Sequence, residues 1–465
     1  MTTEAPLSYA QQLLAAFAVH DGGSVFGGGF VNWCAHELTG PVAPDLLQEA
    51  LDELVVRHSG LRTLVVRDEG FPFQRVAEPA PVPLRIHDAT ASTVDERLRI
   101  TAEITAEALT RPLPPDRVPL MAADLVRFGP DVSSLILLIH RTVADGWTMQ
   151  VAIRDVVAAY ERRRRGTSAS VAPVPQYADH ATAEAAPERE KRIQEALPYW
   201  REQLSGVRRV GIPADRPRPL SPKAAVGEKA LHTFELPDGV VAGLRSRART
   251  LRTTEFTLLL TAYAVALAGH AEHAEHAGPA GQTRIAVPVL SAGRGAGDWD
   301  GIGFYLNGHV LRLDLSGTMT VAEAAAHVHH VNTEALRHDV PLIRILEELP
   351  ELAEAAFEAR DVVPAPMQLC RPIPRSEDPD ATVHYRRLGL PPAVVRETPV
   401  MPVDFLWVME PYASFVVRVT YDPAMFEVAT VERIAARFRA TADRLVTAPD
   451  TLLADLLMDE MGVRR

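Results

Sequence analysis

The order of hydrophobic and polar positions predicts alternating helices and strands along the whole chain. Residues 45–58 have apolar positions at helical spacing, an aspartate near the start and basic residues at the end, which is typical of an amphipathic helix. Residues 133–140 contain a continuous apolar run, as in a strand buried on both faces. Residues 415–421 carry apolar side chains at alternate positions, which favours another strand. The same patterns predict helices over residues 95–108, 147–164, 198–204, 254–268, 321–336 and 430–446, and strands over residues 61–67, 121–128, 230–236, 283–289 and 308–315.

The middle of the chain has the composition of a linker. Residues 166–175 (GTSASVAPVP) are small, polar and proline-bearing. Strands and helices are mixed on both sides of this segment, and 465 residues exceed what one hydrophobic core usually supports. The sequence therefore predicts an α/β (α+β) protein with two lobes, which we place at residues 1–172 and 173–465.

Four consecutive arginines at positions 162–165 precede the linker. Their simplest interpretation is the solvated basic end of a helix, where cations interact favourably with the helix dipole. The alternative is a docking patch for an acidic partner.

The composition limits the classes of partner. Acidic residues number 60 against 48 basic ones, which argues against a nucleic-acid partner. The chain opens without a signal segment and has no run of the roughly 20 apolar residues that a membrane span requires, so we expect no membrane partner and a reducing bacterial cytoplasm. Cys34 and Cys370 are too few for a disulfide scaffold or a zinc site. His270, His273 and His276 are assigned to a solvated loop, so no metal site is predicted.

The segment from His140 to Gly146 (HRTVADG) is the strongest candidate for chemistry. The predicted strand ends at His140, and Gly146 comes just before the next predicted helix, a position where active-site groups are often displayed. Asp145 could cap that helix or pair with a cation, and Gly146 could present its N–H to a ligand. A histidine and an aspartate at a strand end are common, so these residues alone favour a structural role.

The surrounding sequence contains an ordered series of further motifs. HRTVADGWTM is similar to the HHxxxDG motif of the condensation domains of non-ribosomal peptide synthetases. Other segments resemble that family's motifs in the same order: LSYAQQLLAAF from residue 7, RHSGLRT from 57, QYADHA from 176, YWREQLSG from 199, PADRPRP from 213, IGFYLNGHVLR from 302, RHDVPL from 337 and RDVVPAPMQ from 360. The resemblance extends over roughly residues 7–455.

This resemblance implies two chloramphenicol-acetyltransferase-like lobes in a V-shaped pseudo-dimer, with the motif loop in a tunnel between them. It implies no bound cofactor. The phosphopantetheine arm of an acyl or peptidyl carrier protein would enter as substrate, and a small-molecule amine or alcohol would attack its thioester. The expected product is an amide or ester in natural-product biosynthesis.

The resemblance also implies roles for individual residues. The candidate catalytic set is His140, Arg141, Asp145 and Gly146, with Gly146 N–H near the developing oxyanion. The candidate substrate-binding set is Trp147, Tyr305, Asn307 and His309. In the family the aspartate usually pairs with an arginine, and Arg62 and Arg294 are the candidates for an ion pair with Asp145.

Arg141 stands where the family has its second histidine. Its side-chain pKa, above ~12, excludes a general-base role near neutral pH. Losing a general base typically costs ~10²–10⁴-fold in rate, which positioning and oxyanion stabilisation can exceed. Arg141 could instead stabilise an oxyanion or bind a substrate carboxylate or phosphate. His309 is a candidate compensating base, because in an extended segment it shares a face with Asn307.

A second hypothesis is that the chain has lost the chemistry and serves as a docking module. An HRxxxD pattern also occurs in the X domains of glycopeptide synthetases, which are condensation-like modules that recruit oxygenases. Those domains usually have a second aspartate where this chain keeps Gly146. The chain ends soon after the last family helix, so we expect a free-standing condensation enzyme acting in trans.

Overall fold

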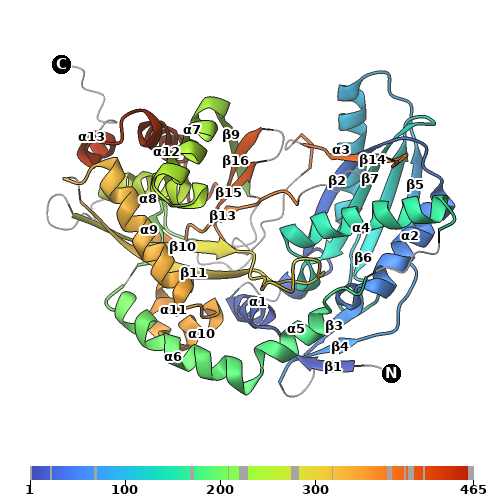
Figure 1. Ribbon diagram of the computed structural model, residues 1–465, viewed down its shortest axis with the longest axis horizontal. Coiled ribbons are helices and arrows are strands. Elements are labelled where there is room, and N and C mark those ends of the chain that lie inside the picture. The colour runs from blue at the N-terminus through green and yellow to red at the C-terminus, as the bar shows by residue number, and fades with distance from the viewer. Residues whose placement is uncertain are drawn as a thin grey trace. The chain divides into compact units, whose positions relative to one another are not determined.

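The computed structural model describes residues 3–458 except 21–23, 68–70, 168–171, 208, 219–228, 274–281, 317, 374–379, 392–393, 396–402 and 412–413. The chain divides into two compact units. The first unit comprises Met1–Glu190, Ala292–Leu306 and Ile373–Pro402, and the second comprises Lys191–Ser291, Asn307–Pro372 and Val403–Arg465. Both units mix helices and strands (Figure 1), which confirms the predicted α/β (α+β) class.

The units differ from the division expected at residues 172/173. The first unit continues past that point to Glu190, because helix α5 (Tyr177–Glu184) packs on it. Tyr177 on α5 is fully buried, and its hydroxyl contacts Ser8 Oγ at 2.6 Å and the Phe304 carbonyl at 2.5 Å. The first unit also takes two segments from the second half of the sequence, which a single boundary does not anticipate.

The loop His140–Gly146, here called the motif loop, follows a central strand of the main sheet of the first unit. Over the described residues this sheet has five strands in the order β14-β2-β7-β6-β5 (Figure 1). β7 is antiparallel to both of its neighbours, and β5 runs parallel to β6. The strands are β14 (His384–Arg387), β2 (Val31–Thr39), β7 (Val132–His140), β6 (Met121–Arg127) and β5 (Leu84–Asp88).

Helices cover both faces of this sheet. Leu135, Leu137 and Ile139 of β7 pack in one cluster with helices α2 (Pro44–Arg57) and α4 (Gly146–Arg164). Ile136 and Leu138 pack in another cluster with α3 (Val94–Thr110). Because successive side chains of a strand point to opposite faces, burial of both faces explains the continuous apolar run of β7.

The first unit contains a second sheet and several further short elements. A smaller sheet, three-stranded within the described ranges, has the order β1-β4-β3. The remaining elements are β1 (Thr3–Pro6), α1 (Tyr9–His20), η1 (Ser24–Phe26), η2 (Ser59–Arg62), β3 (Thr63–Val66), β4 (Phe73–Val76), η3 (Arg141–Val143) and α5.

The second unit is built on a sheet that has six strands in the part of the chain that is described, in the order β11-β10-β13-β15-β16-β9. Its core includes the fully buried rings of Trp407, Tyr263 and Phe438, with α8 packed against α12, α9 and α13 (Figure 1). The six strands are β9 (Ala230–Leu236), β10 (Gln282–Ser291), β11 (Asn307–Ser316), β13 (Met367–Leu369), β15 (Phe405–Pro411) and β16 (Phe415–Tyr421). The short strands β8 (Ile212–Pro213) and β12 (Val362–Val363) pair with each other in a separate sheet. The helices are α6 (Pro187–Gln203), whose residues up to Glu190 belong to the first unit, α7 (Asp238–Thr250), α8 (Glu255–His273), α9 (Val321–Arg337), α10 (Leu342–Glu348), α11 (Pro350–Phe357), α12 (Val428–Thr447) and α13 (Leu453–Met458).

No helix in the described ranges is long and apolar enough to cross a lipid bilayer.

Glu161, a buried residue of α4, accepts hydrogen bonds from the segment that leads into β14. β14 pairs antiparallel with β2, and His384 lies opposite Thr39. Just before β14, the amides of Thr382 and Val383 donate to Glu161 Oε1 at 3.0 and 2.7 Å. Glu161 is therefore a local determinant of where this segment docks.

Replacing Glu161 with alanine is expected to destabilise the first unit by about 2–4 kcal/mol, because the change leaves backbone donors without their charged acceptor. Urea unfolding measures this loss, and limited proteolysis should cut earlier near β14. Glu107→Ala, at an exposed position on α3, is the matched control and should leave the unfolding free energy nearly unchanged. Equal unfolding free energies for the two variants would contradict the anchoring role.

Candidate active site

The motif loop connects the buried end of β7 to the first turn of α4. The short η3 turn, Arg141–Val143, lies between them. Two buried amide side chains hold this turn from outside: Gln11 Nε2 donates to the Thr142 carbonyl at 3.0 Å, and Asn32 Nδ2 donates to the Ala144 carbonyl at 2.6 Å. Sequence reasoning did not single out Gln11 or Asn32, because their role depends on contacts between distant segments.

His140 is fully buried at the end of β7. Its Nε2 lies 3.1 Å from the Gly27 carbonyl, and its Nδ1 lies 2.9 Å from Thr142 Oγ1. Burial, with a smaller contribution from the positive charge of Arg141, lowers the pKa of His140 to about 4. The imidazole is therefore neutral at neutral pH, donates from Nε2 and fixes the turn.

Arg141 is buried too, with 3% of its surface exposed. Its Nε donates to the Val31 carbonyl at 2.9 Å, and its guanidinium carbon lies 5.4 Å from the centre of the Phe30 ring. The backbone amide of Arg141 donates to the Phe30 carbonyl at 2.9 Å. Both the backbone and the side chain of Arg141 thus tie the η3 turn to the start of β2.

Asp145 caps helix α4 and forms a buried ion pair. Its Oδ1 accepts the Thr148 amide at 2.7 Å, which is the usual role of an aspartate at a helix start. Arg294 Nη2 lies 3.0 Å from Oδ1 and 3.2 Å from Oδ2 of Asp145. The Tyr305 amide donates to Oδ2 at 3.2 Å. Burial makes these contacts necessary, because an unpaired carboxylate in the interior is costly.

The structure distinguishes the two candidate partners of Asp145. Arg62 donates to the backbone carbonyls of Val55 and Ala77 at 3.3 and 2.6 Å. Arg294, whose side chain is fully buried, is the partner that Asp145 has in this structure. Arg294 also donates from Nη1 to the carbonyls of Asp298 and Gly301, each at 2.8 Å, so it shapes its own segment.

Thr148 is a site residue that sequence reasoning missed. Its hydroxyl donates to the Gly303 carbonyl at 2.7 Å and lies 3.1 Å from Arg294 Nη2. The Gly303 amide lies 3.2 Å from the same oxygen. The spacing of three residues between Asp145 and Thr148 is typical of a helix cap and could have predicted the hydrogen bond between them. The hydrogen bond from Thr148 to Gly303 depends on tertiary packing and has no such local pattern.

Gly146 opens α4 and is exposed. A Cβ atom placed on Gly146 would meet no described atom within 4 Å, so packing does not require glycine here. By contrast, a Cβ on Gly303 would lie 2.2 Å from the Tyr177 ring. The first turn of α4 is therefore open on the side of Gly146.

Two aromatic side chains flank this turn. Trp147 Nε1 donates to the Trp299 carbonyl at 2.8 Å, and the two indoles meet edge to face with centroids 4.9 Å apart. The Tyr305 ring packs under the Arg294 guanidinium, 4.0 Å from its carbon. Tyr305 is buried, so in the structure its ring supports the ion pair.

The comparisons with known proteins identify the family. A family profile described as Condensation domain matches residues 1–461. The chain belongs to the condensation-domain family. Chondramide synthase cmdD of Chondromyces crocatus is 31% identical over 469 residues, covering 97% of this chain and 11% of that protein. Phosphinothricin tripeptide synthetase PhsC of Streptomyces viridochromogenes is 33% identical over 314 residues, covering 66% of this chain and 28% of that protein. The chain thus spans only a small part of these curated relatives.

Solved structures share the fold. The SgcC5 protein of Streptomyces globisporus is 26% identical with a TM-score of 0.81, covering 96% of this chain and all of that one. The X-domain from teicoplanin biosynthesis is 23% identical with a TM-score of 0.74, covering 97% of this chain and 96% of that one. The first condensation domain of the CDA synthetase is 18% identical with a TM-score of 0.75, covering 97% and 98%. These likenesses confirm the predicted condensation-domain fold.

The remaining candidate residues of this condensation domain lie in its second unit. Asn307 begins β11, and its Oδ1 accepts the Leu342 amide at 3.0 Å. His309 is buried, hydrogen-bonds with Asn332, and has its ring 6.1 Å from that of Trp200. Burial lowers the pKa of His309, which keeps it neutral at neutral pH. These contacts place His309 in the packing of the second unit, and its role as a base stays a prediction.

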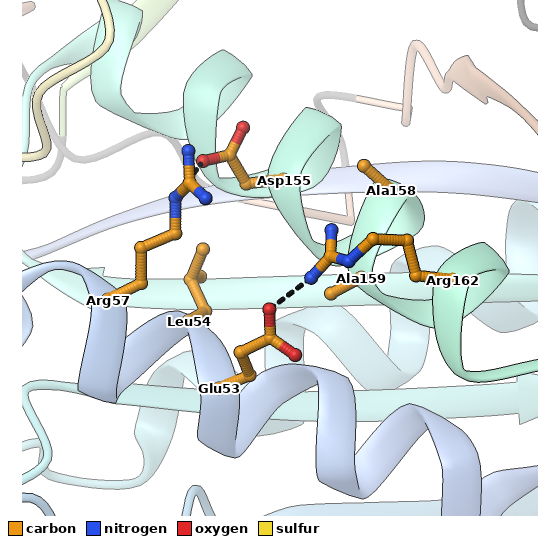
Figure 2. Close-up of a pocket in the computed structure, with 7 residues that line it drawn as sticks. All are labelled: Glu53, Leu54, Arg57, Asp155, Ala158, Ala159 and Arg162. Carbon is orange, nitrogen blue, oxygen red and sulfur yellow. Dashed lines mark hydrogen bonds and ion pairs between the residues drawn. The ribbon is translucent and has the colours of Figure 1, made fainter. Parts of the chain in front are cut away.

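A small pocket between α2 and α4 contains part of the arginine run. Figure 2 shows Arg57 directed toward Asp155 and Arg162 directed toward Glu53. The cavity that these side chains line has a volume of about 80 Å³. Arg162 and Arg163 pair with glutamates of α2, and Arg164 and Arg165 pair with Glu161. Because each of the four has an acidic partner within the first unit, the structure favours the helix-end interpretation over a docking patch.

Within the described ranges, no group of three or more histidine, cysteine, aspartate or glutamate side chains has the arrangement of a metal site. The loop assignment is wrong for His270, which lies in α8 with its Nε2 2.9 Å from the Pro213 carbonyl. His276 lies outside the described residues.

Proposed function

We propose that this condensation domain transfers an acyl or aminoacyl group from the phosphopantetheine thioester of a carrier protein to an amine or alcohol. The observation that carries the proposal is the exposed, open position of Gly146 at the start of α4, directly after the buried Asp145–Arg294 pair. A catalytic centre needs both features: a rigid frame, and a place where the reacting carbonyl can lie against fixed donors.

The first turn of α4 supplies those donors. Asp145 already engages the Thr148 amide through its side chain and the Met149 amide through its carbonyl, at 2.7 and 3.3 Å. The amides of Gly146 and Trp147 precede them, in the turn where helix amides have no intrahelical acceptor. These groups and the positive end of the helix dipole would stabilise negative charge on a thioester oxygen.

With an amine acceptor, the reaction requires no base from the protein. The nucleophile attacks the thioester carbon, a C–N or C–O bond forms, the C–S bond breaks, and the proton of the nucleophile passes to the departing thiolate or to solvent. A thioester is already activated, and a free amine loses its proton late. We infer that His140 and Arg141 act by fixing the turn, since both side chains are buried and bonded to neighbouring backbone.

Replacing Arg141 with alanine is expected to lower kcat/KM by less than about tenfold, whereas removal of an oxyanion donor typically costs about 10²–10³-fold. With an amine acceptor and below about pH 8, kcat/KM should rise with pH along the ionisation of that amine. The profile of kcat/KM against pH should show no separate inflection near pH 6.5, where a histidine base would titrate. Initial rates across pH for wild type and variant measure both. A loss of about 10²-fold or more in a folded variant would make the guanidinium catalytic.

The relatives support particular substrates. Several are named as peptide synthetases or synthases, which supports an amine acceptor and an amide product. The SgcC5 structure contains an aryl ethanediol, which supports an alcohol acceptor and an ester product. Incubation of this chain with an acyl-loaded carrier protein, then with an amine and with a diol, followed by mass spectrometry, tests the proposal. Product formation that requires both the loaded carrier and this chain supports it.

Arg141 at the motif's second position favours a second candidate function, a silent docking module. One solved structure with this fold is an X-domain in complex with OxyB. The same incubation distinguishes the two. Absence of product with every acceptor, together with measurable binding of a carrier protein or an oxygenase, would replace the transferase proposal with docking.

A further inference from the structure

A histidine outside the motif loop bridges two carboxylates in the first unit. His180 lies on α5, with 13% of its side chain exposed. Its Nε2 is 3.3 Å from Glu184 Oε1, and its Nδ1 is 3.3 Å from Asp298 Oδ2. Since both ring nitrogens face acidic oxygens, the geometry suits an imidazolium that donates on both sides.

The two carboxylates are themselves fixed by backbone donors. The Tyr9 amide donates to Glu184 Oε2 at 2.8 Å, and the Gly295 amide donates to Asp298 Oδ2 at 3.0 Å. His180 therefore connects α5 and the start of α1 to the turn Gly295–Gly301. This turn lies in the segment Ala292–Leu306, which carries Arg294.

The surroundings of His180 favour its charged form. Burial lowers its pKa, but the hydrogen bonds and negative charges of Asp298 and Glu184 outweigh burial and raise the pKa to about 9. The two rings packed against His180 are Tyr177, stacked at 6.0 Å, and Tyr305, edge to face at 4.6 Å. Burial raises the pKa of both tyrosines, so they stay neutral over the same range.

The turn that His180 holds is the one that orients Arg294. The carbonyls of Asp298 and Gly301 each accept Arg294 Nη1 at 2.8 Å, while Nη2 reaches Asp145. A shift of this turn would move the guanidinium away from Asp145. Because Asp145 caps α4, the donors at Gly146 would move with it.

We propose that His180 is a positioning residue for acyl transfer: as an imidazolium it holds the Gly295–Gly301 turn, which fixes Arg294 against Asp145 at the start of α4. This role rests on the proposed function. The pKa of His180 is near 6.5 in the unfolded chain and about 9 in the folded protein. The contribution of His180 to holding the turn is therefore complete below pH 6.5 and is lost as pH rises through 9.

The test uses the full chain without substrate, labelled with ¹⁵N at glycine and tyrosine. In wild type, the amide resonances of Gly146 and Tyr305 should shift with a midpoint near pH 9. In His180→Gln this titration should disappear. In His180→Lys, which keeps the positive charge, the midpoint should move toward about 10.4. His384→Gln, at an exposed position on β14, is the matched control and should titrate like wild type.

Turnover with a loaded carrier protein completes the test. His180→Gln should lower kcat by about 10–100-fold with little change in KM, because a misplaced site loses rate more than binding. His180→Lys should recover most of that rate and extend activity to higher pH. Gly146 and Tyr305 resonances that ignore both pH and His180→Gln would overturn the role, whatever the activity. Resonances that respond in a protein with no transfer activity would support the structural link and reject the proposed function.

Discussion

Replacing Arg294 with alanine is expected to destabilise the first unit by about 3–5 kcal/mol, because the change leaves the Asp145 carboxylate buried without its cation. Arg294 and Asp145 side chains are 0% and 4% exposed, so water cannot replace the lost partner. The change also removes the donors to the Asp298 and Gly301 carbonyls. Urea unfolding, followed by hydrogen exchange of first-unit peptides, measures the loss.

Two variants calibrate this prediction. Arg127→Ala removes an exposed pair with Asp88 and should leave the unfolding free energy nearly unchanged, since water solvates both charges. Arg294→Lys keeps the charge but loses the planar fork of donors, so its stability should lie between wild type and Arg294→Ala. If Arg294→Ala unfolds like Arg127→Ala, the ion pair does not organise the site.

Replacing Gly146 with tryptophan is expected to reduce acyl transfer by about 10²–10³-fold or more, because the indole would occupy the space above the first turn of α4 and shield its donors. The fold should survive, since Gly146 is exposed and a side chain there meets no described atom near its Cβ. Product formation by mass spectrometry gives the rate, and thermal unfolding gives the stability.

Two glycine variants separate blockage from damage to the fold. Gly146→Ala should raise the stability by about 0.4–1 kcal/mol, because alanine lowers the entropy of the unfolded chain at a helical position. Gly303→Ala should destabilise the protein, because its Cβ would lie 2.2 Å from the Tyr177 ring. Full turnover by a folded Gly146→Trp protein would show that the reaction does not take place at this turn.

Local patterns in the sequence were sufficient for most elements. The helix predicted over residues 45–58 is α2, Pro44–Arg57, and the strand predicted over 133–140 is β7, Val132–His140. Such elements follow from side-chain periodicity and from residues at helix ends. The helix predicted over residues 198–204 is the end of a longer helix, α6 (Pro187–Gln203), which contains Pro198 in its interior.

The sequence predicted a candidate site but did not predict its contacts. The motif loop and the need of Asp145 for a cation could be inferred, yet Arg62 and Arg294 were equivalent candidates on sequence grounds. Tertiary packing decides between them. Arg62 donates to the backbone carbonyls of Val55 and Ala77, whereas Arg294 donates to the Asp298 carbonyl and lies beside Asp145. His180 had no local signal, since its two carboxylates come from different segments.

Sequence alone determined the fold class, the family and the residue that departs from the family motif, Arg141. Periodicity and ordered motifs are properties of neighbouring residues, so they are readable along the chain. Tertiary structure alone decided that Arg141 bonds to the start of β2, that Arg294 pairs with Asp145, and that Gly146 stays open. These contacts form between segments that are distant in the sequence and are buried together. A buried charge such as that of Asp145 needs a partner, and the packing of the chain decides which residue is close enough to be that partner.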